Sequence, residues 1–600
     1  MSRTLHFSIG PVQEFVSQSR RTRDLLMSSF LLSFLTGHAM IEVIRCKGRI
    51  VFPQVDENPL LLAIQQSNDD LQEEGLWIGS LPNRFQAEIP NEFEPAQCVQ
   101  AVNKAWLRIA NTIWEKVVEP IANHGKDTEK IWQRQVENFW EINWVRGSDR
   151  NLLDRRKYWR NFVPSEEEGD KCMLVSHLQE LSGYLRAHEP VKQDNFWNKI
   201  HKSRYADLFA EESKERLSAI GMIKRYLPLL TKEALGWEFP EEAKYFPSTR
   251  YLGSYPFRKK VVENASLQEQ RDRYAALALK KYPLTHTGRR YFGRQGDRFS
   301  RLVENALQPD NIKDYPKLYQ AFQQLCQSVG SEPTNYYALL MMDGDRLGAW
   351  LQQVEAQEVG RISHALAQFT GSVQEIVKAK DGTLVYAGGD DVMALFPLNT
   401  VLEATFRLRK AYQQAFANVF PEQESSPTIS AGLVFAHSKA SLKQMVSISH
   451  TLLDEIAKEK HGRDSIAIGI YNNSGALIQW GAPWELILDH DTNRLVVLAN
   501  ELALTPSFLY HLKDTYESFA SVTEEESLKK MLLAEWERIN GKPTIVIEQQ
   551  LKQLIEFGYH AYYDENNKLV LDKQSFSADI ALLVRWLRDK GVTENADLDV

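Results

Sequence analysis

A Gly-Gly-Asp-Asp tip between two short apolar runs constrains the fold of this chain more than any other feature. The runs are Thr383–Ala387 and Val392–Phe396, and the tip comprises Gly388, Gly389, Asp390 and Asp391. Strand-forming residues on either side of glycines, which tolerate positive φ, predict a β-hairpin. Adjacent carboxylates repel each other unless a cation neutralises them, and Mg²⁺ prefers such oxygen ligands. The tip is therefore a candidate metal site, with a solvated turn as the alternative.

A second acidic segment precedes the hairpin. The apolar run Tyr336–Met342 leads into Asp343, Gly344, Asp345 and Arg346. This pattern predicts a buried strand whose end delivers Asp343 to a loop. Apolar residues at helical spacing from Arg346 to Gln357 predict a helix, whose first N–H groups would be free to bind phosphate. Carboxylates for two metal ions, together with donors for a triphosphate, are what nucleotidyl transfer requires.

The order of predicted elements around these acids is β-α-β-β-α-β with one further α-β unit. We expect helices up to about residue 380, at 399–418 and at 440–460, and strands at 336–343, 383–387, 391–397, 428–436 and 465–471. This order is typical of a ferredoxin-like fold. Its first strand lies beside the second hairpin strand, so we expect Asp343 and Asp391 to meet.

Several stretches carry a family resemblance. They read MMDGDRLGAWL (341–351), YAGGDDVMALFP (386–397), TISAGLVFAHSKASL (428–442) and AKEKHGRDSIAI (457–468), with FSIGPVQEFVSQSRRTRDLLMSSFLLS (7–33) and LPNRF (81–85) near the start. In this order they resemble the Cas10 family in its Cmr2 type, the large subunit of type III-B CRISPR effector complexes. The matches cover roughly the first 160 residues and 331–475.

The resemblance implies an α+β protein with two ferredoxin-like palm domains. We expect a first, catalytically inert palm at 1–160, a mainly helical linking domain at 161–330, a second palm at 331–480 and a C-terminal helical domain at 481–600. Many relatives begin with an HD nuclease domain. A first strand near Leu5 leaves no room for one in this sequence, so we expect no single-stranded DNase activity.

The resemblance also implies an activity: target-RNA-dependent nucleotidyl transfer from ATP to make cyclic oligoadenylate, with two Mg²⁺ (or Mn²⁺) ions. Asp343, Asp390 and Asp391 would hold the metals and act in catalysis. The nucleotide would contact Gly344, Asp345, Arg346, Gly388, Gly389, Ser363, His364 and Lys458, with Lys443 as a further candidate for pairing with phosphate oxygens. For the lysines, a solvated helix face is the alternative. A variant reaction would join AMP to S-adenosylmethionine.

The first palm offers candidates for an acceptor pocket. Asp56 and Glu141 follow apolar segments, and a surface role is the alternative for both. Gly10-Pro11 predicts the start of a long helix that carries Arg20, Arg21 and Arg23. These arginines would contact nucleotide or RNA phosphate, or form a solvated helix face.

Composition limits the partners and the compartment. A net charge of −8 excludes a generally basic nucleic-acid coat, so any RNA contact should be a local patch. The basic-aromatic clusters within Tyr251–Lys260 and Arg289–Arg298 suit RNA contacts, and they equally suit a protein interface. The apolar stretch Leu25–Ile44 is interrupted by polar residues, which favours a buried helix over a membrane span. Four widely spaced cysteines predict no structural zinc and fit a cytoplasmic protein.

The resemblance implies partnership with a Cmr3-like subunit, small helical subunits, crRNA and target RNA. Two other hypotheses stay open. One is a diguanylate-cyclase-like enzyme, against which stand Val392 and the N-terminal GPVQEF stretch. The other is a catalytically silent scaffold, against which stand the three intact aspartates.

Overall fold

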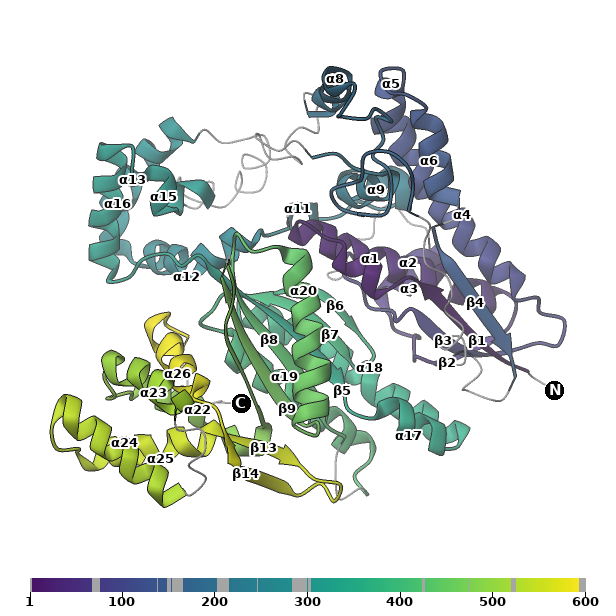
Figure 1. Ribbon diagram of the computed structural model, residues 1–600. Helices are drawn as coiled ribbons and strands as arrows, with labels where there is room; N and C mark the ends of the chain where they lie inside the picture. The colour runs from purple at the N-terminus through teal and green to yellow at the C-terminus, as the bar shows by residue number, and fades with distance from the viewer. Residues whose placement is uncertain are drawn as a thin grey trace.

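The computed structural model describes residues 3–66, 76–137, 139–147, 153, 166–201, 215–244, 246–282, 299, 304–422, 427–472, 474–490, 492–518 and 525–592. The predicted basic-aromatic cluster at Arg289–Arg298 lies outside them. Figure 1 shows two sheets, each with helices packed on it, and a helical C-terminal region beside the second sheet.

The first sheet has four strands in the order β2-β3-β1-β4. Its strands are β1 (Arg3–Gly10), β2 (Arg49–Phe52), β3 (Arg84–Ile89) and β4 (Glu141–Arg146). All neighbouring strands are antiparallel. The helices of this region are α1 (Gln13–Ser17), α2 (Thr22–Arg45), α3 (Pro59–Gln66), α4 (Ala96–Ile113), α5 (Glu119–Ala122) and α6 (Thr128–Glu137).

The second sheet repeats this strand order and extends it to β10-β9-β8-β5-β7-β6. The strands are β5 (Tyr336–Gly344), β6 (Thr383–Gly388), β7 (Asp391–Phe396), β8 (Ile429–His437), β9 (Ser465–Asn472) and β10 (Gly475–Pro483). The helices are α17 (Leu347–Gln353), α18 (Ala356–Ala379), α19 (Val401–Val419) and α20 (Leu442–Thr451), which runs into a π-helix, η7 (Leu452–Lys460). The prediction of two ferredoxin-like sheets in an α+β protein is confirmed.

The apolar run of β5 is buried on both faces, because this strand lies inside the sheet. Leu339 and Met341 belong to a core shared with the first region, whereas Leu340 and Met342 face a core shared with α18, α19 and the C-terminal region. A strand buried on both sides needs no polar alternation. Burial on both faces explains why a continuous apolar run, without alternating polar residues, correctly predicted β5.

The first region also joins the edge of the second sheet. Gly79 forms a parallel bridge with Tyr386, and the Ala387 N–H donates to the Gly79 carbonyl at 3.0 Å. A Cβ on Gly79 would lie 2.8 Å from the Ser29 carbonyl oxygen of α2. Glycine therefore lets this loop fit between α2 and the strand that leads into the hairpin.

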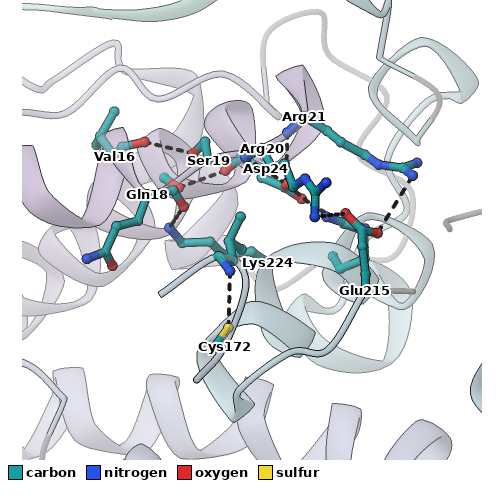
Figure 2. Close-up of polar contacts among 12 residues, drawn as sticks. Val16, Gln18, Ser19, Arg20, Arg21, Asp24, Cys172, Glu215 and Lys224 are labelled. Carbon is teal, nitrogen blue, oxygen red and sulfur yellow. Dashed lines mark hydrogen bonds and ion pairs between the residues drawn. The ribbon is translucent and has the colours of Figure 1, made fainter. Parts of the chain in front are cut away.

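The prediction of one continuous helix after Gly10-Pro11 is wrong, because the structure has two helices there. Helix α1 ends at Ser17 and α2 begins at Thr22, so Arg20 and Arg21 lie in the break and Arg23 lies in the first turn of α2. Asp24 accepts the N–H groups of Arg20 and Arg21, which caps α2. Two buried residues from helix α9 (Ala219–Tyr226) complete the junction (Figure 2).

The first is Lys224, whose Nζ donates to the carbonyls of Phe15 and Gln18 at 2.6 and 3.0 Å. The second is Arg225, which pairs with Asp24 at 2.8 Å and with Glu215 at 2.7 Å. Both α9 side chains are fully buried. Tertiary contacts with these residues therefore stabilise a break that local helix propensity did not predict.

The described residues of the predicted linking domain, 161–330, divide between two cores. Those from Cys172 to Leu252 join the core of the first region, whereas Phe257 to Cys326 form a small separate core. The helices after α6 and before β5 are α8 (Pro190–His201), α9, α10 (Thr231–Leu235), α11 (Glu241–Lys244), α12 (Thr249–Glu263), α13 (Gln268–Lys281), α15 (Pro309–Ile312) and α16 (Pro316–Val329). Figure 1 places α12 beside the second sheet, next to α13 and α16.

The C-terminal region is mainly helical, as the sequence indicated, but it also contains strands that were not predicted. Its elements are α21 (Trp484–Ile487), β11 (Leu488–Asp489), β12 (Thr492–Asn493), α22 (Arg494–Asn500), α23 (Pro506–Ser518), α24 (Glu525–Asn540), α25 (Ile545–Gly558), β13 (Tyr559–Tyr563), β14 (Leu569–Phe576) and α26 (Asp579–Asp589). The β13–β14 hairpin lies against the second palm sheet, where β13 contacts β10.

Helix α2 is long and apolar enough to cross a membrane by length and composition, and it is the one such helix among the described residues. In this structure 78% of its apolar window is buried inside the protein. It packs against α3, α4, α9 and β6. The helix therefore serves here as a core element between the two sheets.

Candidate functional site

Three aspartates meet at one edge of the second sheet. Ligand atoms of Asp343, Asp390 and Asp391 all lie within 4.8 Å of one another. Asp343 lies near the end of β5, Asp390 in the turn of the β6–β7 hairpin, and Asp391 at the start of β7. Strands β5 and β7 pair with Met342 opposite Val392, a register that brings Asp343 level with Asp391. The strand order that the sequence predicted is the reason these acids converge.

Two glycines make this approach possible. Gly389 is the first of two turn residues in the hairpin and has a φ of +70°, which a glycine adopts without strain. A Cβ on Gly344 would lie 2.8 Å from Asp390 Oδ2 and 2.6 Å from Tyr412 Oη. The bare backbone of Gly344 therefore lets Asp390 pack directly over the end of β5.

The three acids carry an excess of negative charge. Asp343 and Asp390 are half-buried and Asp391 is exposed. Desolvation by the surrounding protein raises the pKa values of Asp390 and Asp391 above the usual range for a carboxyl group. The negative charge of Asp391 raises the pKa of Asp390 further. A cation bound between them would remove this repulsion, and carboxylate oxygens suit a hard divalent ion.

Lys458 of η7 is the cation that the structure places here, in an ion pair with Asp343 Oδ2. Burial, together with nearby Arg463, lowers the pKa of Lys458 to about 8, while the contact with Asp343 favours its charged form. At neutral pH this lysine is therefore mostly cationic. One lysine against three carboxylates leaves the cluster short of positive charge.

Asp345 has a different environment from the other acids. Its buried carboxylate accepts hydrogen bonds from the hydroxyls of Thr428 and Ser430, both at 2.8 Å, and from the Asp464 N–H at 3.0 Å. Burial raises its pKa. The Asp345 side chain thus connects β5 to the segments before β8 and β9, and its charge contributes to the raised pKa of Asp390.

The prediction of a single helix from Arg346 to Gln357 is wrong, because the structure divides this range between two helices. Helix α17 ends at Gln353 and α18 begins at Ala356. Arg346 is exposed and precedes α17 with a φ of +58°, in the left-handed region that non-glycine residues rarely adopt. Helix α17 thus has seven residues, and the phosphate-binding site at its start stays a prediction.

A cavity of about 360 Å³ lies between the first region and the second palm. The first region contributes residues 53–59 and 78–81, and the palm contributes α18, β6 and the hairpin glycine Gly389. Four predicted site residues line it: Asp56, Ser363, His364 and Gly389. The His364 ring also contacts Gln54 Oε1 at 3.1 Å across the junction. The cavity therefore reaches the turn that carries Asp390.

Other predicted site residues lie elsewhere. Arg20 is exposed and lies 3.7 Å from Glu215, and Arg23 is half-buried in α2. Glu141 begins β4 opposite Gly10, and Lys443 is exposed in the first turn of α20. None of these four appears among the described residues that line the cavity.

Sequence reasoning missed three residues beside the acids. His450 and Asp454, on consecutive turns of α20 and η7, are close enough to Asp391 for their charges to affect one another's pKa values. The Tyr412 hydroxyl is buried next to Gly344 and has no hydrogen-bond partner among the described residues. The sequence carries no local signal for Tyr412, because it lies in the middle of the amphipathic helix α19.

The four cysteines, Cys46, Cys98, Cys172 and Cys326, are free. Among the described residues, the three aspartates form the one group of acids, histidines or cysteines that could hold a metal ion. The absence of structural zinc stays a prediction.

Two family models match separate parts of the chain. Residues 336–467 match the second palm domain of Cas10/Cmr2, and residues 4–115 match the N-terminal part of the CRISPR-associated protein Cmr2. The chain is also similar to the CRISPR system Cmr subunit Cmr2 of Pyrococcus furiosus, with 23% identity over 92% of this chain and 71% of that protein.

Solved structures share the fold over nearly the whole chain. A cryo-EM structure of type III-B Cmr-beta in the apo state matches with a TM-score of 0.63 and 14% identity, over 98% of this chain and 82% of the other. Cmr-beta bound to cognate target RNA matches with a TM-score of 0.63 and 15% identity, over 98% and 83%. The two family models in this order, the similarity to Cmr2 and the shared fold together support a Cmr2-type member of the Cas10 family.

Proposed function

We propose that this chain is the large subunit of a type III CRISPR effector complex and that its second palm transfers nucleotidyl groups from ATP to make cyclic oligoadenylate. The observation that carries the proposal is the convergence of Asp343, Asp390 and Asp391 beside Lys458, next to a cavity between the two palms. Acids, a cation and a space for a small molecule are together what nucleotidyl transfer needs.

The three carboxylates fit a pair of divalent metal ions, Mg²⁺ or Mn²⁺. They offer hard oxygen ligands within 4.8 Å of one another, and their mutual repulsion favours cation binding. When bound, such ions would supply activation of the attacking hydroxyl and neutralise charge on the leaving pyrophosphate. Holding these ions is the role we assign to Asp343, Asp390 and Asp391.

The neighbouring residues would bind and orient the nucleotide. Lys458 supplies a charge for phosphate oxygens, and exposed Arg346 lies three residues beyond Asp343. Ser363 and His364 line the cavity from the palm side, and Asp56 lines it from the first region. We assign this cavity to the nucleoside part of a substrate, because it reaches the hairpin at Gly389.

The family supports a place in a ribonucleoprotein. Cmr-beta, whose fold this chain shares, has been captured bound to cognate target RNA. We therefore propose that this chain assembles with a Cmr3-like subunit, small helical subunits and crRNA in the cytoplasm, and that target RNA activates it. The net charge of −8 supports this dependence, because the isolated chain lacks the overall positive charge that holds RNA by phosphate contacts.

The test uses the assembled complex with target RNA, Mg²⁺ and each α-labelled nucleoside triphosphate in turn. We expect a cyclic labelled product from ATP alone, which disappears without target RNA or with EDTA. A parallel reaction contains labelled S-adenosylmethionine, and a product that carries both labels would replace cyclic oligoadenylate with AMP transfer. A cyclic product from GTP would indicate diguanylate-cyclase-like chemistry, and no product in any reaction would favour the silent scaffold.

A further inference from the structure

The Tyr412 side chain is fixed inside the second palm. It lies in the middle of α19 and is fully buried. Its ring packs against Phe369 of α18 and Phe416 of α19, with ring centroids 5.1 and 4.9 Å away. A ring that is buried against two aromatic neighbours has little freedom to change its orientation. The packing of the core therefore sets the direction of the Tyr412 hydroxyl.

The hydroxyl points toward the three-aspartate cluster. A Cβ on Gly344 would lie 2.6 Å from Tyr412 Oη and 2.8 Å from Asp390 Oδ2, so both oxygens lie within 2.8 Å of one point. They approach each other across the bare backbone of Gly344. The turn that carries Asp390 is held as well, because the Thr370 hydroxyl of α18 donates to the Gly389 carbonyl at 3.3 Å. Tyr412 therefore reaches the Asp390 carboxylate from the core side of a fixed turn.

The Tyr412 hydroxyl is a donor that lacks an acceptor. It has no hydrogen-bond partner among the residues that the structure describes. Most buried hydroxyls have a partner, because an unpaired one destabilises the folded protein. At neutral pH a tyrosine hydroxyl is protonated, so it can donate one hydrogen bond. A buried, unpaired donor directed at a carboxylate indicates a hydrogen bond that forms in another state of the site.

We propose that Tyr412 positions Asp390 for metal binding, by donating a hydrogen bond to the carboxylate oxygen that the ion leaves free; the inference rests on the proposed function. Carboxylates that hold a metal ion are themselves hydrogen-bonded by neighbouring groups, which fix their orientation. Because the Tyr412 ring is already held by the core, its hydroxyl needs no rearrangement of the helix to make this bond. Tyr412 acts through Asp390 and is thus a positioning residue, distinct from the three metal-holding aspartates.

The test is Tyr412→Phe in the full chain, with Mn²⁺ alone as the probe. This change removes the hydroxyl and keeps the ring that packs against Phe369 and Phe416. Electron paramagnetic resonance measures free Mn²⁺ during a titration, and the combined Asp390→Asn and Asp391→Asn variant shows how much Mn²⁺ binds elsewhere. We expect Mn²⁺ affinity to fall by about tenfold to a hundredfold, while the apparent melting temperature without metal stays equal or rises.

Tyr337→Phe is the matched control. Tyr337 of β5 is also fully buried, and its hydroxyl likewise has no hydrogen-bond partner within the described part of the chain. It lies at the far end of this strand from Asp343, about 20 Å away by the rise of a strand. The control should match Tyr412→Phe in melting temperature and should keep the wild-type Mn²⁺ affinity. An equal loss of affinity in both variants would overturn the role of Tyr412.

Combining Tyr412→Phe with Asp390→Asn tests whether the hydroxyl acts through Asp390. If it does, adding Tyr412→Phe to Asp390→Asn should weaken Mn²⁺ binding no further. A further loss as large as that of Tyr412→Phe alone would overturn the inference. So would unchanged Mn²⁺ affinity in Tyr412→Phe, or a lower melting temperature without metal. A wild-type chain that binds no more Mn²⁺ than the variant without Asp390 and Asp391 would instead overturn the metal site of the proposed function.

Discussion

Two clusters of acidic and basic side chains in this chain differ in how well their charges are balanced. At the junction of α1, α2 and α9, Arg225 lies between Asp24 and Glu215, and all three side chains are buried. Arg225 lowers the pKa values of both acids against the effect of burial. In the second palm, three aspartates share a single lysine, and the pKa values of Asp390 and Asp391 are raised.

The difference shows how the same residue types serve structure in one place and a ligand in another. In the first cluster the hydrogen bonds between Arg225 and its acids measure 2.7–3.0 Å, so the protein itself satisfies each charge. In the second, the carboxylates crowd together and the compensating charge is incomplete. A cluster that satisfies itself holds helices together, whereas one that does not is prepared to bind a cation from solution.

The largest expected effect comes from Asp390→Asn combined with Asp391→Asn. Without both carboxylates the metal ions would lose most of their ligands, so nucleotidyl transfer should fall by about a thousandfold or more. Stability should stay equal or rise, because the change removes like-charge repulsion. The assembled complex is compared with wild type for labelled product and for apparent melting temperature. Full activity would break the metal assignment, and a large loss of stability would mean that the cluster is structural after all.

The next largest effect is on stability, from Arg225→Met. This change keeps much of the buried volume but leaves Asp24 and Glu215 without their main partner, so the free energy of unfolding should fall by about 3–5 kcal/mol. Denaturant unfolding followed by tryptophan fluorescence measures this loss. If the variant is as stable as wild type, the two clusters do not differ in the way we describe.

A smaller effect, which depends on pH, is expected at Lys224. Burial lowers its pKa to about 7, so between about pH 7 and its ordinary value of 10.5 the unfolded chain carries a proton that the folded chain lacks. Stability from this group should therefore rise with pH across that window, by at most about 1.4 kcal/mol per pH unit. Below about pH 7 Lys224 is protonated in both the folded and the unfolded chain, so the destabilisation caused by burying its charge should be complete and constant there.

Lys224→Met tests this slope. Apparent melting temperatures are measured from pH 6 to 9, and the variant should show a weaker increase with pH than wild type. Parallel curves for the two proteins would mean that Lys224 is protonated throughout and is satisfied by the carbonyls of Phe15 and Gln18.

The smallest loss of stability is expected from removing a partly exposed ion pair, which contrasts with the buried cluster around Arg225. Arg186 is 41% exposed and pairs with Asp194 at 2.8 Å. Water already solvates both groups, so Arg186→Met should reduce stability by only about 0.2–1 kcal/mol. The same unfolding assay that is used for Arg225→Met gives the comparison. A loss as large as that of Arg225→Met would show that burial does not set the difference between the pairs.

The sequence predicted much of the second palm because its signals are local. Apolar runs, a glycine turn and their order indicated β5, β6, β7, β8 and β9 close to their observed bounds. The ferredoxin-like order then placed β5 beside β7, so the meeting of Asp343 and Asp391 followed from topology. The hairpin of β13 and β14 was missed, because its short strands lie among strongly amphipathic helices.

What the sequence determined by itself was the set of acids, the strands that carry them and the resemblance to the Cmr2 type of the Cas10 family. Only the tertiary structure decided where the remaining charges act. It turned Asp345 inward, interrupted the helix at Arg20 and Arg21, and brought Lys458 against Asp343. It also formed the cavity between the first region and α18. The physical reason is that strand patterns are read from neighbours in sequence, whereas ion pairs, buried hydrogen bonds and cavities depend on residues far apart in the chain, such as Gln54 and His364, which are 310 positions apart.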